Sequence, residues 1–170
     1  ERFRSSDDRF DFLGYTEIRK NQFQLIGDRF YITLQDGKEE TAVATQGIFV
    51  AFESGQATAL TLDYHFESEK GTLTGDVVSL ILSKTSDSTQ TIYILCQRLL
   101  FSTRDESYEG DSPAPDRVQI NKGSLEAFSQ KFQYDGSRES LLLEQNVDIN
   151  DPENKRSIRA SQVQLDLQTD

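Results

Sequence analysis

The sequence predicts an all-β, antiparallel fold built from a repeated strand–turn–strand unit, and two observations support this prediction. Apolar and polar residues alternate over short segments such as "ATALTLDY" at 57–64, so each segment has an inward and an outward face. The same pattern then recurs along the chain, whereas the spacing of an amphipathic helix is almost absent. Val, Ile, Thr, Tyr and Phe suit strands, and Gly, Asp, Asn and Ser separate them.

The first half of the unit is a strand with the pattern small–x–x–apolar–x–apolar. It begins at Ala59, Cys96, Ser129 and Ala160, and reads "ALTLDY", "CQRLLF", "SQKFQY" and "ASQVQL". Successive copies start 37, 33 and 31 residues apart. Internal similarity at a period of about 20 to 50 residues indicates a repeat architecture.

The second half of the unit is a returning strand that follows a charged turn. Val77 comes 13 residues after Tyr64, and Val147 comes the same 13 residues after Tyr134. In the copy between them, the proline-containing loop "DSPAPD" precedes the returning strand "RVQI". We therefore expect every unit to form a hairpin whose large apolar residues face inward.

Two further segments fit this scheme. The stretch "YITLQDGKEETAVATQGIFVAF" predicts another hairpin with "QDGK" as its turn. The stretch "SLEAFSQKF" could form a turn of helix, but its strand interpretation matches the repeat better. An ordinary antiparallel sandwich of sequential strands remains the alternative to a specialised repeat fold.

Composition narrows the classes of partner. The chain has 170 residues, which suits one domain with a core of its own. It carries 29 acidic and 18 basic residues, a net charge of −11, so we expect no nucleic-acid partner and no attraction to an anionic membrane surface. The single cysteine excludes an intrachain disulfide, and no apolar run approaches the length of a membrane span. Because the chain contains no Met, residue 1 is not the translational start, and we expect that a signal peptide, a membrane anchor or other residues removed from the front precede it.

The repeated unit resembles the OstA-like domain of the lipopolysaccharide-transport (Lpt) machinery. The resemblance covers residues 57–167, through "ATALTLDYHFESEKGTLTGDVVSL", "LCQRLLFSTRDESYEG", "SLEAFSQKFQYDGSRESLLLEQNVDI" and "SIRASQVQLDL". The first fifty residues fit only loosely, through "GYTEIRKNQFQLIGDRFYI". The chain departs from the family where Asp usually follows the small residue, since it has Leu60, Gln97, Gln130 and Ser161 there. "QNV" also replaces "GNV", which favours a divergent branch.

The resemblance implies a twisted β-jellyroll shaped like a folded taco, with a partly open apolar slot between its two layers. Family members of this kind are exported to the periplasm or cell envelope, where the slot shields the acyl chains of lipopolysaccharide or a related lipid. Their edge strands pair with other OstA-like domains to extend the slot. The implied role is non-enzymatic and needs no cofactor or metal; the A-type bridge, the C-type anchored subunit and the outer-membrane component all stay open.

On this interpretation the inward apolar residues line the lipid slot; the alternative is that they simply fill a closed core. The residues expected to line the slot are Leu62, Tyr64, Val77, Leu99, Phe101, Val118, Ile120, Phe132, Tyr134, Val147, Ile149, Val163 and Leu165. We expect residues 1–16 to form a leader or tether and residues 17–170 a single domain. Pairing edges are expected around 18–25 and 163–167. The arginines and lysine of the first twenty residues are candidates for attracting lipid phosphates.

Nothing in the sequence predicts an active site. Asp63, His65, Glu67 and Glu69 share a strand face, which is typical of a solvated surface more than of a cation site. His65 is the only histidine, and no GxSxG or phosphate-binding loop is present. Cys96 occupies the small position of its repeat, where a packed, inert thiol is expected. The competing function is a closed sandwich or short β-solenoid that binds carbohydrate or a protein through Phe10, Phe12 and Tyr15.

Overall fold

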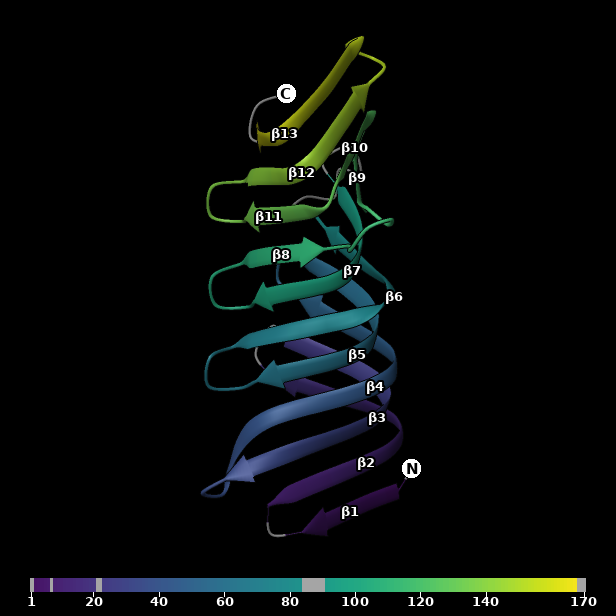
Figure 1. Ribbon diagram of the computed structural model, residues 1–170. Helices are drawn as coiled ribbons and strands as arrows, with labels where there is room; N and C mark the ends of the chain where they lie inside the picture. Colours follow the sequence, from purple (N-terminus) through teal and green to yellow (C-terminus); the bar gives the residue numbers. More distant parts are fainter. Residues whose placement is uncertain (1, 7, 21–22, 84–90, 168–170) are drawn as a thin grey trace.

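The computed structural model describes residues 2–6, 8–20, 23–83 and 91–167, apart from the side chains of residues 2–6 and 20. Its secondary structure consists of strands joined into one antiparallel sheet (Figure 1). The strands are β1 (Arg2–Ser6), β2 (Arg9–Lys20), β3 (Phe23–Gln35), β4 (Lys38–Phe52), β5 (Gly55–His65), β6 (Lys70–Leu82), β7 (Ile92–Ser102), β8 (Ser107–Asp111), β9 (Val118–Lys122), β10 (Leu125–Ser129), β11 (Lys131–Asp135), β12 (Ser140–Asp151) and β13 (Arg156–Asp166). The predicted all-β, antiparallel fold is confirmed. Among the described residues, no helix has the length and hydrophobicity needed to cross a membrane.

The strands succeed one another in chain order along the long axis. β7 pairs with β8 through one half and with β9 through the other, and β12 pairs likewise with β11 and β10. Together β8 and β9 therefore take the place of one long strand, and β10 and β11 take the place of the next. This sequential order is what a chain of repeated hairpins produces.

Most long strands bend sharply near the middle, which folds the sheet into two facing layers. Pairing shifts register at these bends, for example between Thr45 and Ile48 in β4 and between Glu144 and Val147 in β12. Residues with positive φ occupy several bends, including Gln46, Gly47 and Asn146. Bulges of this kind bend a strand and increase its twist. We call the line of bends the spine and the opposite side, where the hairpin turns lie, the mouth.

The two layers are named by their turns. The first arm carries the mouth-side turns at 36–37, 66–69, 103–106 and 136–139, and the second arm carries those at 53–54, 123–124 and 152–155. In Figure 1 the first arm lies in front with its turns on the left, and the strands curve back at the spine on the right. The turn at Asp36 and Gly37, both with positive φ, is the one that "QDGK" predicts.

The core fills the space between the arms and follows the alternation seen in the sequence. Cross-strand neighbours on one face form continuous inner rows, such as Leu62, Leu73 and Leu99, all at most 1% exposed. Glycines make room for large rings in these rows. A Cβ at Gly71 would lie 2.4 Å from the Phe101 ring, and one at Gly110 would lie 2.4 Å from Phe132. Each of these rings therefore occupies the space that the glycine on the neighbouring strand leaves free.

The structure corrects the predicted orientation of Val77. Its side chain is 59% exposed, whereas the next residue, Val78, is fully buried and takes the inward place. The bulge of β6 spans Thr74 to Val78, one residue more than the bulge of β12 between Glu144 and Val147. The shared 13-residue spacing therefore does not mark equivalent positions, because one extra residue reverses the face of a strand.

The N-terminal residues join the sheet. β1 pairs with β2, and β2 pairs with β3 from Arg9 to Lys20, so the boundary expected after residue 16 falls inside a strand. β1 covers only Arg9–Leu13 of β2, which leaves the remainder of β2 as a free edge within the described residues. At the other end β13 pairs, among the residues that the structure describes, with β12 alone, as expected for an edge at residues 163–167. Leu25, by contrast, lies in an interior strand and is not at an edge.

Candidate acyl-chain slot

The structure places the predicted slot residues, except Val77, on the inner faces of the two arms. Ten are buried, and Val163 and Leu165 on edge strand β13 are half-buried against the core. Leu99 and Phe132 have no exposed surface at all. The strand interpretation of "SLEAFSQKF" is confirmed, since it forms β10 and β11 with Ala127 and Phe132 inward.

A row of aromatic rings fills the mouth side of the slot. Phe23 from the second arm stacks on Tyr64 from the first, with ring centroids 4.6 Å apart. Phe52, also from the second arm, lies 5.1 Å from Phe101 and 5.6 Å from Tyr108. Offset and edge-on contacts of this kind stabilise a pair by about 0.5–1.5 kcal/mol beyond area burial. The slot is therefore covered along the middle of the molecule.

A buried hydrogen bond adds to this cover. The hydroxyls of Ser54, in a turn of the second arm, and Tyr108, on β8, are 2.8 Å apart. Burial raises the pKa of Tyr108 to about 12, against the opposing effect of the Ser54 hydrogen bond. Burial also raises the pKa of Tyr134 to about 12, and the centroid of its ring lies 6.0 Å from that of Tyr108. These hydroxyls stay protonated at neutral pH.

The two ends of the slot are more open than its middle. Phe10, Phe12 and Ile18 are half-buried on the inner face at the N-terminal end. At the C-terminal end Ile158, which pairs with buried Ile149 and so shares its face, is 41% exposed. The inner apolar surface therefore reaches the free edge strands at both ends, and the slot is partly open there.

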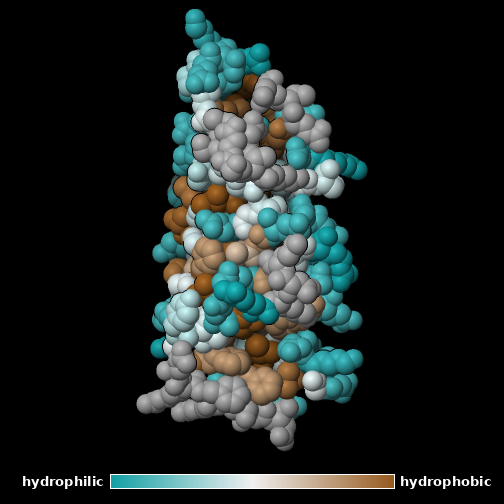
Figure 2. Space-filling model, turned by 180° about the vertical axis from the view of Figure 1, so that it is seen from behind, coloured by the Kyte–Doolittle hydropathy of each residue, from teal (hydrophilic) through white to brown (hydrophobic). Residues whose placement is uncertain are grey.

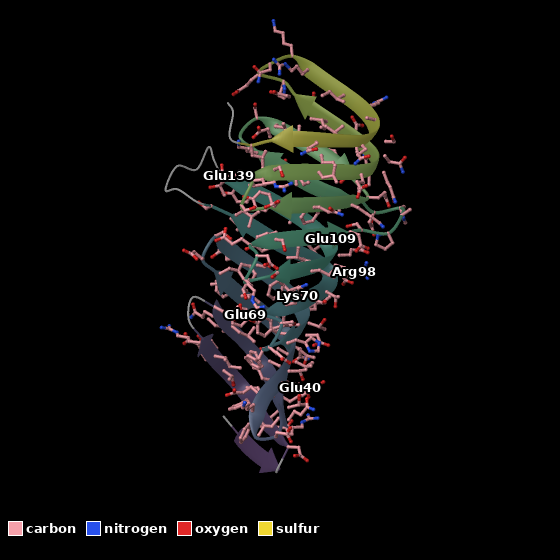
Figure 3. The ribbon with its side chains drawn as sticks, turned by 90° about the vertical axis from the view of Figure 1, so that its left-hand side faces the viewer. Glu40, Glu69, Lys70, Arg98, Glu109 and Glu139 are labelled. Carbon is pink, nitrogen blue, oxygen red and sulfur yellow. The ribbon has the colours of Figure 1, made fainter. Side chains whose placement is uncertain are left out.

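The turns of the first arm place carboxylates along the mouth. Glu69, Glu106 and Glu139 occupy equivalent turns, and each adopts a positive φ, at 55°, 47° and 49°. The carbonyl of each accepts a hydrogen bond from a backbone N–H further along the sheet, namely that of Thr103 and that of Gly136, which begin the next turns, and that of Leu167, which follows β13. Figure 3 looks onto this side, with Glu69 and Glu139 labelled near the turns. Glu69 lies 3.6 Å from Arg104, so part of this negative charge is neutralised by a neighbouring turn.

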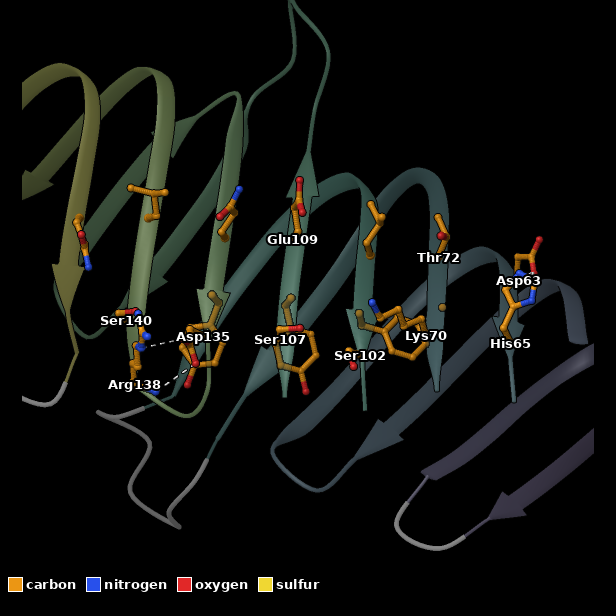
Figure 4. A pocket seen from close by; sticks show the side chains of 18 residues that line it. Asp63, His65, Lys70, Thr72, Ser102, Ser107, Glu109, Asp135, Arg138 and Ser140 are labelled. Atoms are coloured by element: carbon orange, nitrogen blue, oxygen red, sulfur yellow. Dashed lines mark hydrogen bonds and ion pairs between the residues drawn. The ribbon is translucent and has the colours of Figure 1, made fainter. Parts of the chain in front are cut away.

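An outer groove, which the sequence analysis missed, crosses the first arm on its solvent side. Its volume is about 580 Å³, and its lining includes Lys70, Leu100, Glu109, Arg138 and Leu142 (Figure 4). Polar outward residues were expected here, and Gln133 and Gln164 belong to them. The signal that could have found it is an apolar residue at an outward repeat position, as in Leu100 and Leu142.

The other polar candidates have surface or structural roles. His65 Nε2 lies 3.7 Å from Asp63 Oδ1, and both side chains are more than half exposed. Within the described ranges, no three His, Cys, Asp or Glu side chains are grouped so as to hold a metal. Burial, and to a lesser degree the charge of Asp111, raises the pKa of the Cys96 thiol to about 12. Cys96 is therefore the packed, unreactive thiol that its repeat position predicts.

The N-terminal basic residues are partly neutralised by neighbours. Arg9 pairs with Asp11 at 2.6 Å and also lies over the Tyr31 ring, 4.0 Å from its centroid. Arg19 pairs with Glu17, and this contact is the main reason why the pKa of that carboxyl is lowered. The side chains of Arg2, Arg4 and Lys20 lie outside the described residues. The arginines that are described therefore offer little free charge to a lipid phosphate.

Comparison with solved structures identifies a similar protein. The crystal structure of LptH from Pseudomonas aeruginosa is described as that of the LptA-homologous periplasmic component of the conserved lipopolysaccharide transport device. It superposes with a TM-score of 0.63, covering 75% of this chain and 93% of LptH, at 13% sequence identity. At that identity the likeness establishes a shared Lpt-bridge-like β-jellyroll fold and not a shared activity. No protein-family model matches the chain, and no curated protein sequence matches it.

Proposed function

We propose that the protein is a non-enzymatic lipid-binding domain of a transport bridge in the periplasm or cell envelope. It shields the acyl chains of lipopolysaccharide or a related envelope lipid between the inner and outer membranes. The observation that carries this proposal is the set of inner apolar rows, which run from one edge strand to the other and are still exposed at both ends. The fold shared with LptH, a periplasmic transport component, supports it.

The mechanism is passive. Removing acyl methylenes from water contributes about 0.8 kcal/mol each, so chains can be held without a polar anchor. Since aromatic rings cover the mouth, the chains load through the ends and displace core side chains as they advance. Energy for directional movement comes from other components of the machine.

Neighbouring OstA-like domains are the proposed protein partners. Within the described residues, the outer edge of β13 and the half of β2 that β1 leaves uncovered lie next to inner apolar residues that are not fully buried, namely Ile158, which is exposed, and Ile18, which is half-buried. Strand addition at either edge would satisfy the backbone groups of that edge and prolong the inner rows into the next domain. The slot would then be continuous across the junction.

The competing carbohydrate- or protein-binding module finds less support. Phe10 and Phe12 pair with Ile32 and Phe30 and pack against the core, so they belong to the slot side. Tyr15, 60% exposed, is the one ring of the expected platform that faces solvent. A platform of three rings is therefore not formed.

Native mass spectrometry with lipid extraction, on protein purified from a bacterial host, tests the proposal. The inner-row variant Ile158→Asp is compared with the outer-face variant Leu100→Asp, because these residues are similarly exposed at 41% and 39%. We expect acyl lipid to co-purify with the wild type and with Leu100→Asp and to be reduced with Ile158→Asp. A wild-type protein free of lipid that also ignores added lipopolysaccharide would overturn the proposed function.

A further inference from the structure

The repeat is interrupted at one place on the spine. Strands β2 to β7, β12 and β13 each cross the spine as one continuous strand, interrupted at most by a bulge. Between β8 and β9, however, the loop Ser112–Arg117 replaces the crossing, and Gln130 separates β10 from β11. A cavity of about 500 Å³ lies at this interruption, and we call it the spine pocket. The hairpin repeat alone does not require such a pocket.

Arg117 is the unusual residue of the spine pocket. Its Nη2 donates to the carbonyl oxygen of Phe128 at 3.2 Å and to that of Asn146, and its guanidinium lies 5.3 Å from the centre of the Phe128 ring. Its Nε is buried and has no hydrogen-bond partner. None of the ion pairs formed by described residues includes Arg117. A cation is thus held by neutral carbonyls in a protein of net charge −11.

A second arginine faces the same cavity from the edge strand. Arg159 on β13 lines the pocket and pairs with Asp148 across the β12–β13 ladder at 3.6 Å. Its side chain is 84% exposed, so this ion pair is weak and the guanidinium is free to turn. Asn146, at the bulge of β12, adds a carboxamide to the lining. The remaining lining is mixed, with Pro115 as one wall and with the Gln130 carboxamide and the Asp148 carboxylate as further polar groups.

We propose that the spine pocket binds a phosphate-bearing group, with Arg117 and Arg159 as its cationic contacts. Guanidinium groups approaching from two elements can contact different oxygens of a tetrahedral anion. Arg159 offers a forked set of donors, and Arg117, whose Nη2 donates to two carbonyls, offers Nη1. Arg117 and Arg159 together with Asp148 give the lining a net charge of +1, which suits a single phosphate group. A polyanion is disfavoured, because the acidic protein around the pocket repels it. The carboxamides of Gln130 and Asn146, which also line the pocket, suit the hydroxyls of a sugar or glycerol unit that carries the phosphate.

The proposed site is separate from the slot. It opens at the spine, whereas the aromatic rings and the turn carboxylates lie at the mouth. Phosphate binding therefore requires neither acyl chains in the slot nor a neighbouring domain, and it stands or falls independently of the proposed transport role. The ligand source is either a soluble sugar phosphate or the headgroup of a phospholipid.

Amide NMR titration of the whole chain tests the site. The probes are inorganic phosphate, a hexose 1-phosphate and short-chain phosphatidic acid below its micelle concentration. We expect saturable shifts at residue 114 and at residues 116–117, 146–148 and 159–160, since Pro115 has no amide proton. Binding should weaken about tenfold in Arg159→Gln and remain unchanged in Arg156→Gln, a nearby exposed arginine on the same strand. Arg117→Lys, which keeps the charge but has no Nη1, should weaken binding, and its melting temperature is measured alongside because the change also alters the contacts with the Phe128 and Asn146 carbonyls.

The outcomes separate the alternatives. Saturation by all three probes would support a site for soluble phosphates, and saturation by phosphatidic acid alone would support a lipid headgroup site. Shifts that do not saturate at millimolar phosphate would overturn the proposal. Equal weakening in Arg159→Gln and Arg156→Gln would also overturn it, because general charge attraction would then account for the binding.

Discussion

Three weak acids in the core link individual residues to the pH dependence of the fold. Cys96, Tyr108 and Tyr134 each have a pKa of about 12, raised mainly by burial from ordinary values of 9.0 for the thiol and 10.0 for the phenols. In each case the folded state retains a proton that the unfolded chain releases more easily. Their contribution to stability is therefore complete below about pH 9 and declines as the pH rises toward 12.

Because these three pKa values are raised on folding, stability should decrease at high pH. We expect the urea midpoint of unfolding to stay constant between pH 7 and about pH 8.5 and to fall steadily from about pH 9 to pH 12. The Cys96 thiol should also resist a thiol reagent at pH 8 unless denaturant is added. Cys96→Ala, which restores the small residue found in other repeats, should remove the first part of the decline. A midpoint that rises above pH 9 would contradict the pKa directions.

The turn glutamates provide a second prediction. Glu106 adopts φ 47°, a conformation that costs a residue with a Cβ about 1–2 kcal/mol and glycine very little. We expect Glu106→Gly to raise the free energy of unfolding by about 0.5–1 kcal/mol, measured by chemical denaturation. Glu109→Gly, within strand β8, should lower it by about 0.5–1 kcal/mol, because glycine weakens a strand interior. If both variants changed the free energy of unfolding in the same direction, the positive φ of Glu106 would not account for the effect of the glycine.

At the scale of elements, the bulges decide which face of a strand is buried. Val77 and Val78 are neighbours in β6, yet the first is 59% exposed and the second fully buried. We expect Val78→Asp to destabilise the protein by about 3 kcal/mol or more and Val77→Asp to change its stability by less than about 0.5 kcal/mol. Thermal melts of the two variants measure the difference. The opposite ranking would mean that the bulge of β6 is one residue shorter than described.

The strands themselves were predictable because their alternation is local. The small residues Ala59, Cys96 and Ser129 are buried, as their repeat positions predict, and outward Asp63 and Gln133 are exposed. The length of a bulge was not predictable, since it depends on how two neighbouring strands pair, and Val77 was misassigned for that reason. The spine pocket could not be predicted from the sequence either. "DSPAPD" was recognised as a loop, but the placing of Arg117 against Phe128 and Asn146 depends on contacts between distant segments.

At the scale of the whole molecule, the free edges and the net charge act in opposite directions. Unpaired edge strands at both ends favour end-to-end association, and a charge of −11 on every copy opposes it. Salt screens this repulsion, with a Debye length of about 8 Å at physiological ionic strength. Higher salt should therefore shift the equilibrium from monomers toward end-to-end assemblies.

Sedimentation velocity measures this balance. We expect the average mass to increase when salt is raised from low to physiological concentration. The double variant Ile158→Lys with Leu165→Lys places charges on the inner face of β13 and should remain monomeric in both conditions. A matched variant, Gln162→Lys with Gln164→Lys, changes the outward face of the same strand and should still associate. If both double variants associate equally, β13 is not the pairing edge.

The central claim is that acyl chains occupy the space between the two arms, and photo-cross-linking tests it most directly. A photoreactive p-benzoylphenylalanine is placed at Phe101 or Leu165 on the inner face, or at the adjacent outward residues Leu100 and Gln164. Each protein is irradiated with lipopolysaccharide, and the adducts are located by mass spectrometry. The account predicts adducts on acyl carbons from the two inner positions and few from the outer two. Adducts from Leu100 and Gln164 alone would place the lipid on the outer groove and contradict the slot.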